Sequence, residues 1–349
     1  MIGVDVGGTK IRSGVVDREG TVHERYEALS PGTREADLVR ALDEAVEAVL
    51  VDTIGAIGFG VPANLDRRTG RVLSSTNLEF DDFDLAAHAR DRFGLPVGVE
   101  NDANAATLAE WKLGAGRGRS DLILLTLGTG VGGGIVLDDR LYRGWAEIGH
   151  MVVLAGGPPC QGNCHGHGHV EALCSGTAAD RAAQELWGPD ADAHLLVERA
   201  REGDDGARAR LAEIGGYLGA AIGSLANLFD PEVVLIGGGF GEAAGELVLG
   251  PAQDAARREA LAPADATLRI EPAVLGAEAG LVGAALVGFD ALDGTADPCH
   301  LPSALPRSAT STTSRYGCSQ NCGMPTSSSA RTHVVRASCS SVTGSTRGF

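Results

Sequence analysis

The chain has 349 residues, 44% of them hydrophobic, and a formal net charge of −17 at pH 7. These values predict a globular protein of one large or two smaller domains, and the negative charge disfavours nonspecific binding to nucleic acid or to anionic membranes. No stretch reaches the roughly 18 consecutive apolar residues of a membrane helix. Because the sequence enters a strand at once, without a charged and apolar leader, we expect a cytoplasmic protein.

The first block, residues 1–116, alternates strands with helices, as is typical of α/β layers with mostly parallel sheets. Its first helix places Leu38, Leu42 and Val46 on one apolar face. We expect strands at residues 1–6, 12–17, 21–28, 54–61 and 96–100, and helices at residues 35–50 and 101–113.

The second block, residues 117–276, begins with a glycine-rich hairpin at residue 121. A Cys/His/Gly-rich loop, a mainly helical run and an apolar strand closing in three glycines follow. We expect the loop at residues 156–169, the helical run up to residue 229 and the strand at residues 233–239. A last apolar helix near residues 277–292 is expected to be packed, with the first block as a candidate partner.

Residues 293–349 differ in composition from the rest of the chain. They hold twenty Ser or Thr residues and four of the seven cysteines, but no Glu and no Lys. Such a segment buries too little apolar surface to offset its ordering entropy, so we predict a disordered tail. We interpret it as a frame-shifted or misassigned end of the reading frame, not as a disulfide framework.

Two segments repeat one pattern without a gap. Residues 4–17 (VDVGGTKIRSGVVD) align with residues 125–138 (LTLGTGVGGGIVLD), and both consist of strand, glycine turn, strand and acidic turn. Glycines let the backbone approach a phosphate closely, and Lys10 is one of only two lysines. Two such hairpins predict two lobes that close over a nucleotide, and hence phosphoryl transfer. A pair of ordinary tight turns is the alternative.

Residues 128–133 also match G-x-G-x-x-G, with Glu147 near the spacing of a ribose-binding acid. That dinucleotide motif requires a helix after the glycines, whereas residues 134–139 are typical of a strand and a hairpin turn. A dinucleotide-dependent dehydrogenase is therefore disfavoured.

Asn101 and Asp102 lie where a predicted strand gives way to a helix. A carboxylate at that junction is suited to accept the proton of a sugar hydroxyl as the hydroxyl attacks phosphorus. The alternative is that either residue only caps the helix.

Four residues have the types and the spacing of a tetrahedral zinc site: His150, Cys160, Cys164 and His169. His165 and His167 are further candidates for the fourth ligand, and an unligated loop is the alternative. Glu147 and Glu171 bracket the loop, where zinc would orient polar groups toward sugar hydroxyls, although a solvated face is possible on spacing alone. Cys174 is expected to be a buried packing residue.

Taken in order, DVGGTK, ENDANAA, LGTGVGGG, EIGHM, CQGNC and LIGGG resemble the ROK family of sugar kinases and repressors, and in particular its bacterial glucokinases. The resemblance covers residues 1–292 and omits the tail. It implies the two-lobed, ribonuclease H-like α/β fold of actin-like ATPases, with duplicated phosphate hairpins. It also implies ATP with Mg²⁺, a structural Zn²⁺, a hexose substrate and a homodimer or higher homo-oligomer.

The same resemblance assigns roles residue by residue. Asp102 matches the catalytic base, and sugar contacts match Asn101, Asp102, Glu147, His150 and Glu171. The nucleotide-binding positions are Asp5, Gly7, Gly8, Thr9, Lys10, Gly128, Thr129, Gly130, Gly132, Gly237, Gly238 and Gly239. The zinc ligands are His150, Cys160, Cys164 and His169, so His150 has two roles.

Three departures from the family pattern accompany this assignment. His169 stands where a cysteine is usual, the two zinc cysteines are spaced more widely than C-x-C, and the lead through residues 143–147 is shorter than usual. We predict ATP-dependent phosphorylation of a hexose, glucose to glucose 6-phosphate. The alternatives are a noncatalytic sugar-binding regulator, a kinase for another hexose or an N-acetylhexosamine, and polyphosphate as the donor. The family's repressors carry an N-terminal helix-turn-helix, which we do not expect here.

Overall fold

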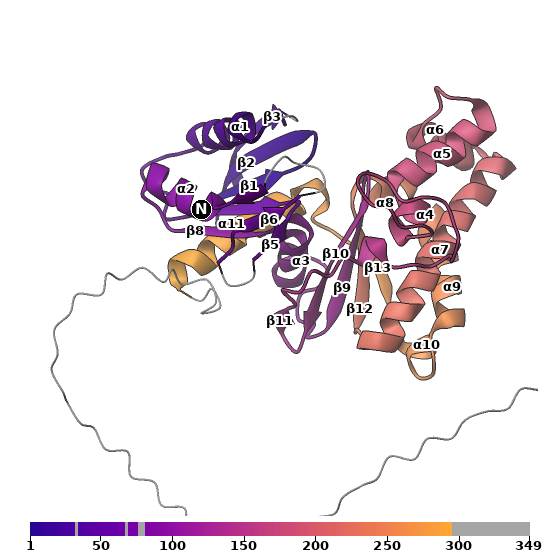
Figure 1. Cartoon of the computed structure of the whole chain (residues 1–349). Coiled ribbons are helices and arrows are strands. Elements are labelled where there is room, and N and C mark those ends of the chain that lie inside the picture. The colour runs from indigo at the N-terminus through magenta and orange to yellow at the C-terminus, as the bar shows by residue number, and fades with distance from the viewer. Residues whose placement is uncertain (32–33, 67–68, 76–80, 295–349) are drawn as a thin grey trace, which may run out of the picture. The chain divides into compact units, whose positions relative to one another are not determined.

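The computed structural model describes residues 1–31, 34–66, 69–75 and 81–294. Within these residues the chain is a mixed α/β fold built on two five-stranded sheets (Figure 1). The predicted disorder beyond residue 294 lies outside the described residues.

The first sheet has the strand order β3-β2-β1-β4-β8. Strands β1, β2 and β3 form an antiparallel meander, whereas β4 and β8 run parallel to β1. The bounds are β1 Ile2–Val6, β2 Lys10–Val16, β3 Val22–Leu29, β4 Ile57–Val61 and β8 Val97–Asn101.

The second sheet, β11-β10-β9-β12-β13, repeats this plan. Its antiparallel hairpin β9–β10 is extended by β11 on one side, and β12 and β13 add in parallel on the other. The bounds are β9 Leu122–Leu127, β10 Val131–Leu137, β11 Arg140–Leu141, β12 Val233–Gly237 and β13 Ile270–Pro272. The two segments of the sequence repeat therefore form the equivalent hairpins β1–β2 and β9–β10.

Helices follow the strands and cover the sheets. The α-helices are α1 Glu35–Glu47, α2 Leu85–Phe93, α3 Asp102–Lys112, α4 Val170–Cys174, α5 Gly176–Trp187, α6 Ala193–Glu202, α7 Asp205–Phe229, α8 Gly239–Ala244, α9 Glu246–Glu259, α10 Ala264–Thr267 and α11 Ala279–Asp293. Two short 3-10 turns are η1 Ile148–His150 and η2 Gly276–Glu278.

Helix α11 lies against the first sheet although it is the last described element of the chain, as its orange ribbon shows in Figure 1. Glycines permit this close approach. A Cβ at Gly58 in β4 would overlap the carbonyl oxygen of Ala284, and one at Gly3 in β1 would overlap that of Leu281. On its other side, Gly283 packs against the backbone of Ala105 in α3. Backbone-to-backbone packing of this kind excludes any larger residue.

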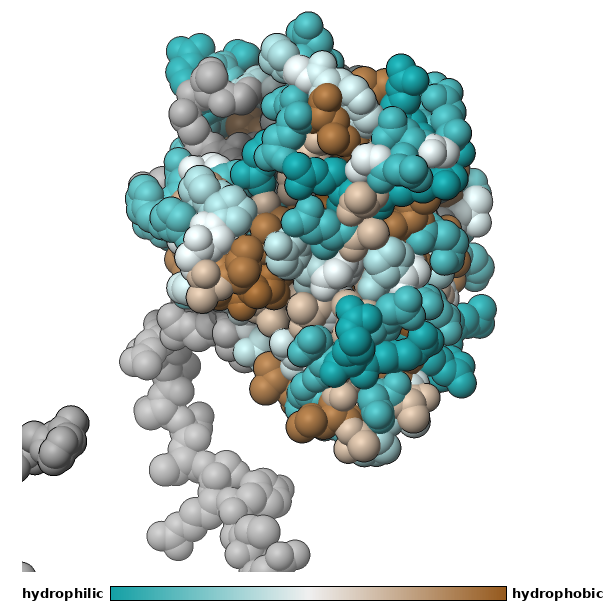
Figure 2. Space-filling model, turned by 90° about the vertical axis from the view of Figure 1, so that its right-hand side faces the viewer, coloured by the Kyte–Doolittle hydropathy of each residue, from teal (hydrophilic) through white to brown (hydrophobic). Residues whose placement is uncertain are grey.

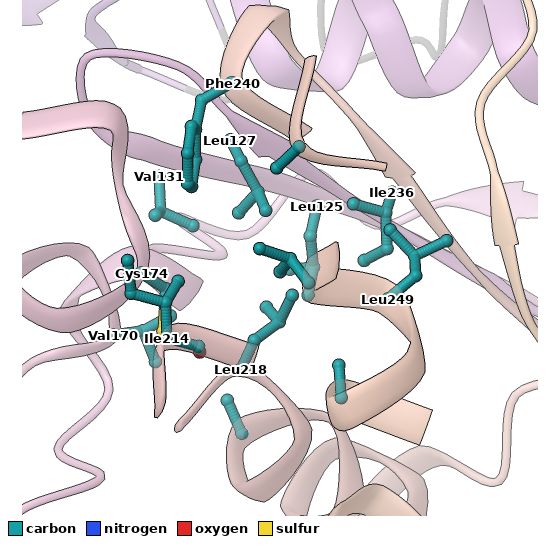
Figure 3. Close-up of a cluster of buried hydrophobic side chains, with 14 of the residues drawn as sticks. Leu125, Leu127, Val131, Val170, Cys174, Ile214, Leu218, Ile236, Phe240 and Leu249 are labelled. Carbon is teal, nitrogen blue, oxygen red and sulfur yellow. The ribbon is translucent and has the colours of Figure 1, made fainter. Parts of the chain in front are cut away.

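The second sheet packs against α7 and α9. Leu125 and Ile236 from the strands meet Leu218 of α7 and Leu249 of α9 in one buried cluster (Figure 3). Cys174 at the end of α4 belongs to the same cluster and is completely buried, as the sequence predicted for a packing residue.

A small antiparallel sheet of order β5-β6-β7 stands beside the first sheet, and neither it nor α2 follows from the sequence patterns above. Its strands are β5 Asn64–Leu65, β6 Val72–Ser74 and β7 Asp81–Phe83. None of the described helices has the length and apolar character needed to cross a membrane. Figure 2 shows one face of the molecule, on which hydrophilic residues predominate and hydrophobic ones occur in separate patches.

Candidate active site

The turn between β1 and β2 is the first of the two predicted phosphate loops. The Gly7 amide donates to the carbonyl oxygen of Lys10 at 2.8 Å, which closes the turn, and Gly8, Thr9 and Lys10 are exposed. The ammonium group of Lys10 lies 2.6 Å from a Glu27 carboxylate oxygen on β3. The turn thus presents backbone and a hydroxyl to solvent, while its lysine is paired.

The turn between β9 and β10 is the second loop, and neighbouring side chains hold its backbone. The Gly128 amide donates to the carbonyl oxygen of Gly130 at 2.9 Å. The carbonyl oxygen of Thr129 accepts from Gln161 Nε2 at 3.0 Å and from Thr177 Oγ1 at 2.8 Å. Gln161 lies between the two cysteines of the Cys/His loop, so this loop contacts the phosphate hairpin directly.

Glycines further along β10 face helix α3. A Cβ at Gly132 would stand 3.1 Å from the Ala103 Cβ, and one at Gly134 would overlap the Thr107 hydroxyl. The glycine run therefore serves the close packing of α3 on β10, in addition to any role near a phosphate.

Gly237, Gly238 and Gly239 form the junction between β12 and α8. Gly238 has a φ of 84°, and a Cβ there would crowd the backbone of Leu127 at 2.5 Å. The strand ends at Gly237, two residues earlier than predicted, because this left-handed turn redirects the chain into α8. The short helix then begins next to the end of β9.

Asn101 and Asp102 begin α3, as the sequence predicted. The Asn101 side chain caps the helix, because its oxygen accepts from the amides of Ala103 at 3.0 Å and Asn104 at 3.1 Å. The capping role therefore belongs to Asn101. Asp102 Oδ1 also accepts from the Ala103 amide, at 2.9 Å.

Asp102 carries an unusual proton affinity for a carboxyl group. Burial, together with the nearby charges of Asp5 and Glu147, raises its pKa to about 6. Burial also raises the pKa of Asp5, against an opposing effect of Arg12. The structure therefore brings together carboxylates from the first hairpin, the start of α3 and the segment before η1.

Glu147 and Glu171 approach the same region from the second block. Burial raises the pKa of Glu147, with a further increase from Glu171 and a decrease from His150. Glu171 Oε2 accepts from the Val131 amide at 3.0 Å, at the start of β10. Glu171 is therefore attached to the second phosphate hairpin and is not part of a freely solvated face.

The four predicted metal ligands converge: the ligand atoms of His150, Cys160, Cys164 and His169 all lie within 4.8 Å of one another. His150 Nδ1 is 3.4 Å from His169 Nδ1 and 3.7 Å from Cys160 Sγ, and Cys164 Sγ is 3.6 Å from His169 Nδ1. Tetrahedral zinc, with bonds of about 2.0 Å to nitrogen and about 2.3 Å to sulfur, requires neighbouring ligand atoms about 3.3 to 3.8 Å apart. The donor set suits zinc and these three distances have that spacing, and of the three candidate histidines His169 is the one in this cluster.

Sequence reasoning missed one buried group in this region, Glu100. It immediately precedes Asn101, its side chain is 7% exposed, and it pairs with Arg143 at 3.1 Å. Asn101, Asn104, Arg143 and Trp145 line one pocket with Glu100. The signal was present in the sequence, since a charged residue ending an apolar strand needs a partner when it is buried.

Two sheets of equivalent order, each with a glycine-turn hairpin in the same place, define the two-lobed fold of actin-like ATPases. The chain belongs to the ROK family, whose sequence profile matches residues 1–289.

Two curated relatives are the glucokinases of Streptomyces coelicolor and Thermotoga maritima. They are 37% and 34% identical to this chain, and the alignments cover 81% and 82% of it and 96% of each relative. Among solved structures, a ROK family glucokinase from Streptomyces griseus in complex with glucose and AMPPNP is 36% identical, with a TM-score of 0.73 over 83% of this chain and 99% of that one. A ROK hexokinase from Thermus thermophilus is 35% identical, with a TM-score of 0.71 over 84% and 99%.

Proposed function

We propose that this protein is an ATP-dependent hexose kinase that phosphorylates glucose to glucose 6-phosphate. The relatives support the reaction, since glucokinases match nearly their whole length and a structural neighbour was solved with glucose and AMPPNP. The observation that carries the proposal is the Asp102 carboxyl, whose pKa of about 6 lets it be ionised at neutral pH and still take up a proton.

Asp102 is the general base in this proposal. It accepts the proton of the sugar 6-hydroxyl while that oxygen attacks the γ-phosphorus, and the bond to the leaving ADP oxygen breaks. Asn101, Glu147, His150 and Glu171 bind the other sugar hydroxyls. Their role is to orient the 6-hydroxyl, because phosphoryl transfer depends mainly on positioning and charge stabilisation.

The two hairpin turns bind the phosphates of ATP through backbone amides of Gly7, Gly8, Gly128, Thr129 and Gly130, and the hydroxyl of Thr9 assists. The turn at residues 237–239 receives the adenosine. Mg²⁺, when bound, would neutralise charge on the phosphates, and Asp5 would help to hold it through water.

The cluster of His150, Cys160, Cys164 and His169 holds a structural Zn²⁺ in this proposal. The fit of the donor atoms to tetrahedral spacing supports it. Such an ion would fix the loop that carries Gln161 and the ring of His150. It would thereby orient the residues of the sugar site without entering the reaction.

The family resemblance also favours a homodimer or higher homo-oligomer, and the net charge of −17 disfavours a nucleic-acid partner. Light scattering of the purified protein measures its oligomeric state directly, and a monomer at micromolar concentration would contradict this part of the proposal.

The decisive experiment is ADP release from Mg·ATP across a panel of hexoses and N-acetylhexosamines, with polyphosphate as a second donor. We expect turnover with glucose and ATP. Turnover with another sugar only would reassign the substrate, and turnover with polyphosphate only would reassign the donor. No turnover by folded, zinc-loaded protein that binds glucose would favour the sugar-binding regulator.

A further inference from the structure

We infer that the ion pair between Glu100 and Arg143 is a positioning device of the hexose site, which holds the segment bearing Glu147 against the start of α3 bearing Asn101 and Asp102. The inference rests on the proposed function, and it adds two residues that act through Asn101, Asp102 and Glu147.

Glu100 is bound on several sides at the end of β8. Its Oε1 accepts from the Asn101 amide at 3.1 Å and from Asn104 Nδ2 at 3.1 Å, and its Oε2 accepts from Arg143 Nε at 3.1 Å. The carboxylate is thus fixed to the first turn of α3, where Asn101, a predicted sugar contact, caps the helix and Asp102, the predicted base, is its first residue. Any movement of Glu100 is transmitted to the Asn101 backbone.

Arg143 belongs to the second block of the chain. It follows β11 by two residues and precedes Glu147 by four, in a segment without helix or strand. The segment bends sharply, since Ala146 has a φ of 41°. Because regular backbone hydrogen bonding does not define this segment, its position relative to α3 depends on side-chain contacts such as the one from Arg143 to Glu100.

Electrostatics make this contact stronger than a surface ion pair. Glu100 is 7% exposed and Arg143 26% exposed, so solvent screens their attraction only in part. Removing one partner of such a pair leaves a buried charge uncompensated, whereas removing both does not. The loss of glucose affinity in the double variant should therefore be smaller than the sum of the losses in the two single variants.

The test compares Arg143→Gln, Glu100→Gln and the double variant with the wild type. Glucose affinity is measured by isothermal titration calorimetry without nucleotide, and KM and kcat are measured by ADP release. We expect each single variant to weaken glucose binding about tenfold, the effect of one charge-assisted hydrogen bond, and to lower kcat. The KM for Mg·ATP and the metal content should stay unchanged. The double variant should lose less than the sum of the single losses, and Arg143→Lys should recover part of the affinity.

A matched control is Arg119→Gln, which removes an arginine paired with Glu232 at 3.4 Å. This pair lies near the start of β9, whereas the predicted phosphate turn follows the end of that strand. It should leave glucose affinity and both KM values at wild-type level. Wild-type behaviour of Arg143→Gln, or equal loss of glucose and Mg·ATP affinity, would overturn the positioning role while leaving the kinase assignment intact. A wild-type protein that neither binds nor phosphorylates glucose would remove both.

Discussion

Asp102 differs from an ordinary surface carboxylate because it is partly shielded from solvent and lies near two other acids. Burial and the charges of Asp5 and Glu147 raise its pKa from 3.8 to about 6. A base with such a pKa suits a reaction in which the proton leaves the sugar hydroxyl late, because it is ionised at neutral pH without being held far from protonation. The same environment opposes folding of the ionised form, so function and stability have opposite requirements at this residue.

Replacing Asp102 by Asn should abolish phosphorylation, because the amide cannot accept the hydroxyl proton. In the wild type, kcat/KM for glucose should fall about tenfold per pH unit below pH 6, as the base becomes protonated. Initial rates of ADP release between pH 5 and pH 8 measure both effects. Substantial turnover by Asp102→Asn, or a flat profile across pH 6, would contradict the role as base. Asp254→Asn, at an exposed carboxylate on α9, is the control and should be fully active.

Although Asp102→Asn should abolish activity, it should make the folded protein more stable at neutral pH. Because folding raises this pKa, the folded chain holds the proton more tightly than the unfolded chain. The carboxyl's stability contribution is therefore present below about pH 4 and is lost as the pH rises through about 6. This pKa shift lowers the free energy of unfolding by at most about 3 kcal/mol at neutral pH. Thermal unfolding should show the Asn variant above the wild type at pH 7.5, with the difference vanishing near pH 4. A less stable variant at pH 7.5 would contradict the desolvation argument.

At the scale of elements, the Cys/His loop connects the predicted sugar site with the second phosphate hairpin. His150 and Glu171 flank the loop, and Gln161 within it donates to the Thr129 carbonyl oxygen. Glycines and prolines at residues 156–168 form no core of their own, so a metal ion would give the loop its order.

Cys160→Ser should therefore lower zinc content and melting temperature together, because three ligands bind zinc less tightly than four. Metal analysis of the purified protein and a thermal melt measure the two quantities. Cys174→Ala offers a contrast, since it removes a buried sulfur outside the cluster and should lower the melting temperature with no loss of zinc. Wild-type protein purified without any bound metal would end the zinc proposal.

The contact between α11 and the first sheet depends on glycine at several positions. In Gly58→Ala the new methyl group would overlap the Ala284 carbonyl oxygen, and backbone cannot yield as a flexible side chain can. We expect a loss of about 3 kcal/mol in the free energy of unfolding, measured by urea denaturation. Gly216→Ala in α7 is the matched control: no atom lies within 4 Å of its added Cβ, and it should stabilise the helix by about 1 kcal/mol. Equal stability of both variants would contradict tight packing at Gly58.

The sequence predicted the elements whose patterns are long and periodic. The duplicated hairpins, helix α1 and the α3 start at Asn101 all follow from alternation, apolar spacing or a capping residue. The small sheet β5-β6-β7 was not predicted, because strands of two or three residues show too little periodicity. Helix α2 was missed although Asp84 caps it and Gly94 ends it, since its charged surface masks the apolar face.

The candidate site divides in the same way. Glycine turns and the Cys/His spacing are local patterns, so residues 5–10, 128–132 and 150–169 could be singled out from the sequence alone. The Glu100–Arg143 pair joins residues 43 positions apart, and the bond from Gln161 to Thr129 joins residues 32 apart. No local pattern specifies such contacts, because they arise only when segments distant in the sequence fold together.

At the scale of the whole molecule, the two equivalent sheets place one predicted phosphate hairpin in each half of the described chain, and α11 and α3 pack between them (Figure 1). Helix α11 ends at Asp293, whose carboxylate pairs with Arg18 at 2.9 Å. The ROK profile ends at residue 289. The structural match to the Streptomyces griseus glucokinase covers 83% of this chain and 99% of that protein. The matched part of the chain therefore ends within α11.

Truncation after Gly294 should consequently leave kcat, KM and melting temperature at their full-length values. The removed residues are rich in Ser and Thr and poor in apolar side chains, and they lie beyond the ROK profile. The retained chain keeps α11, its glycine contacts with β1 and β4, and the Arg18–Asp293 pair. A second truncation after Glu278, which removes α11, serves as the contrast and should prevent folding of the first sheet. A clear drop in activity or melting temperature for the chain ending at Gly294 would show that residues 295–349 take part in the native structure.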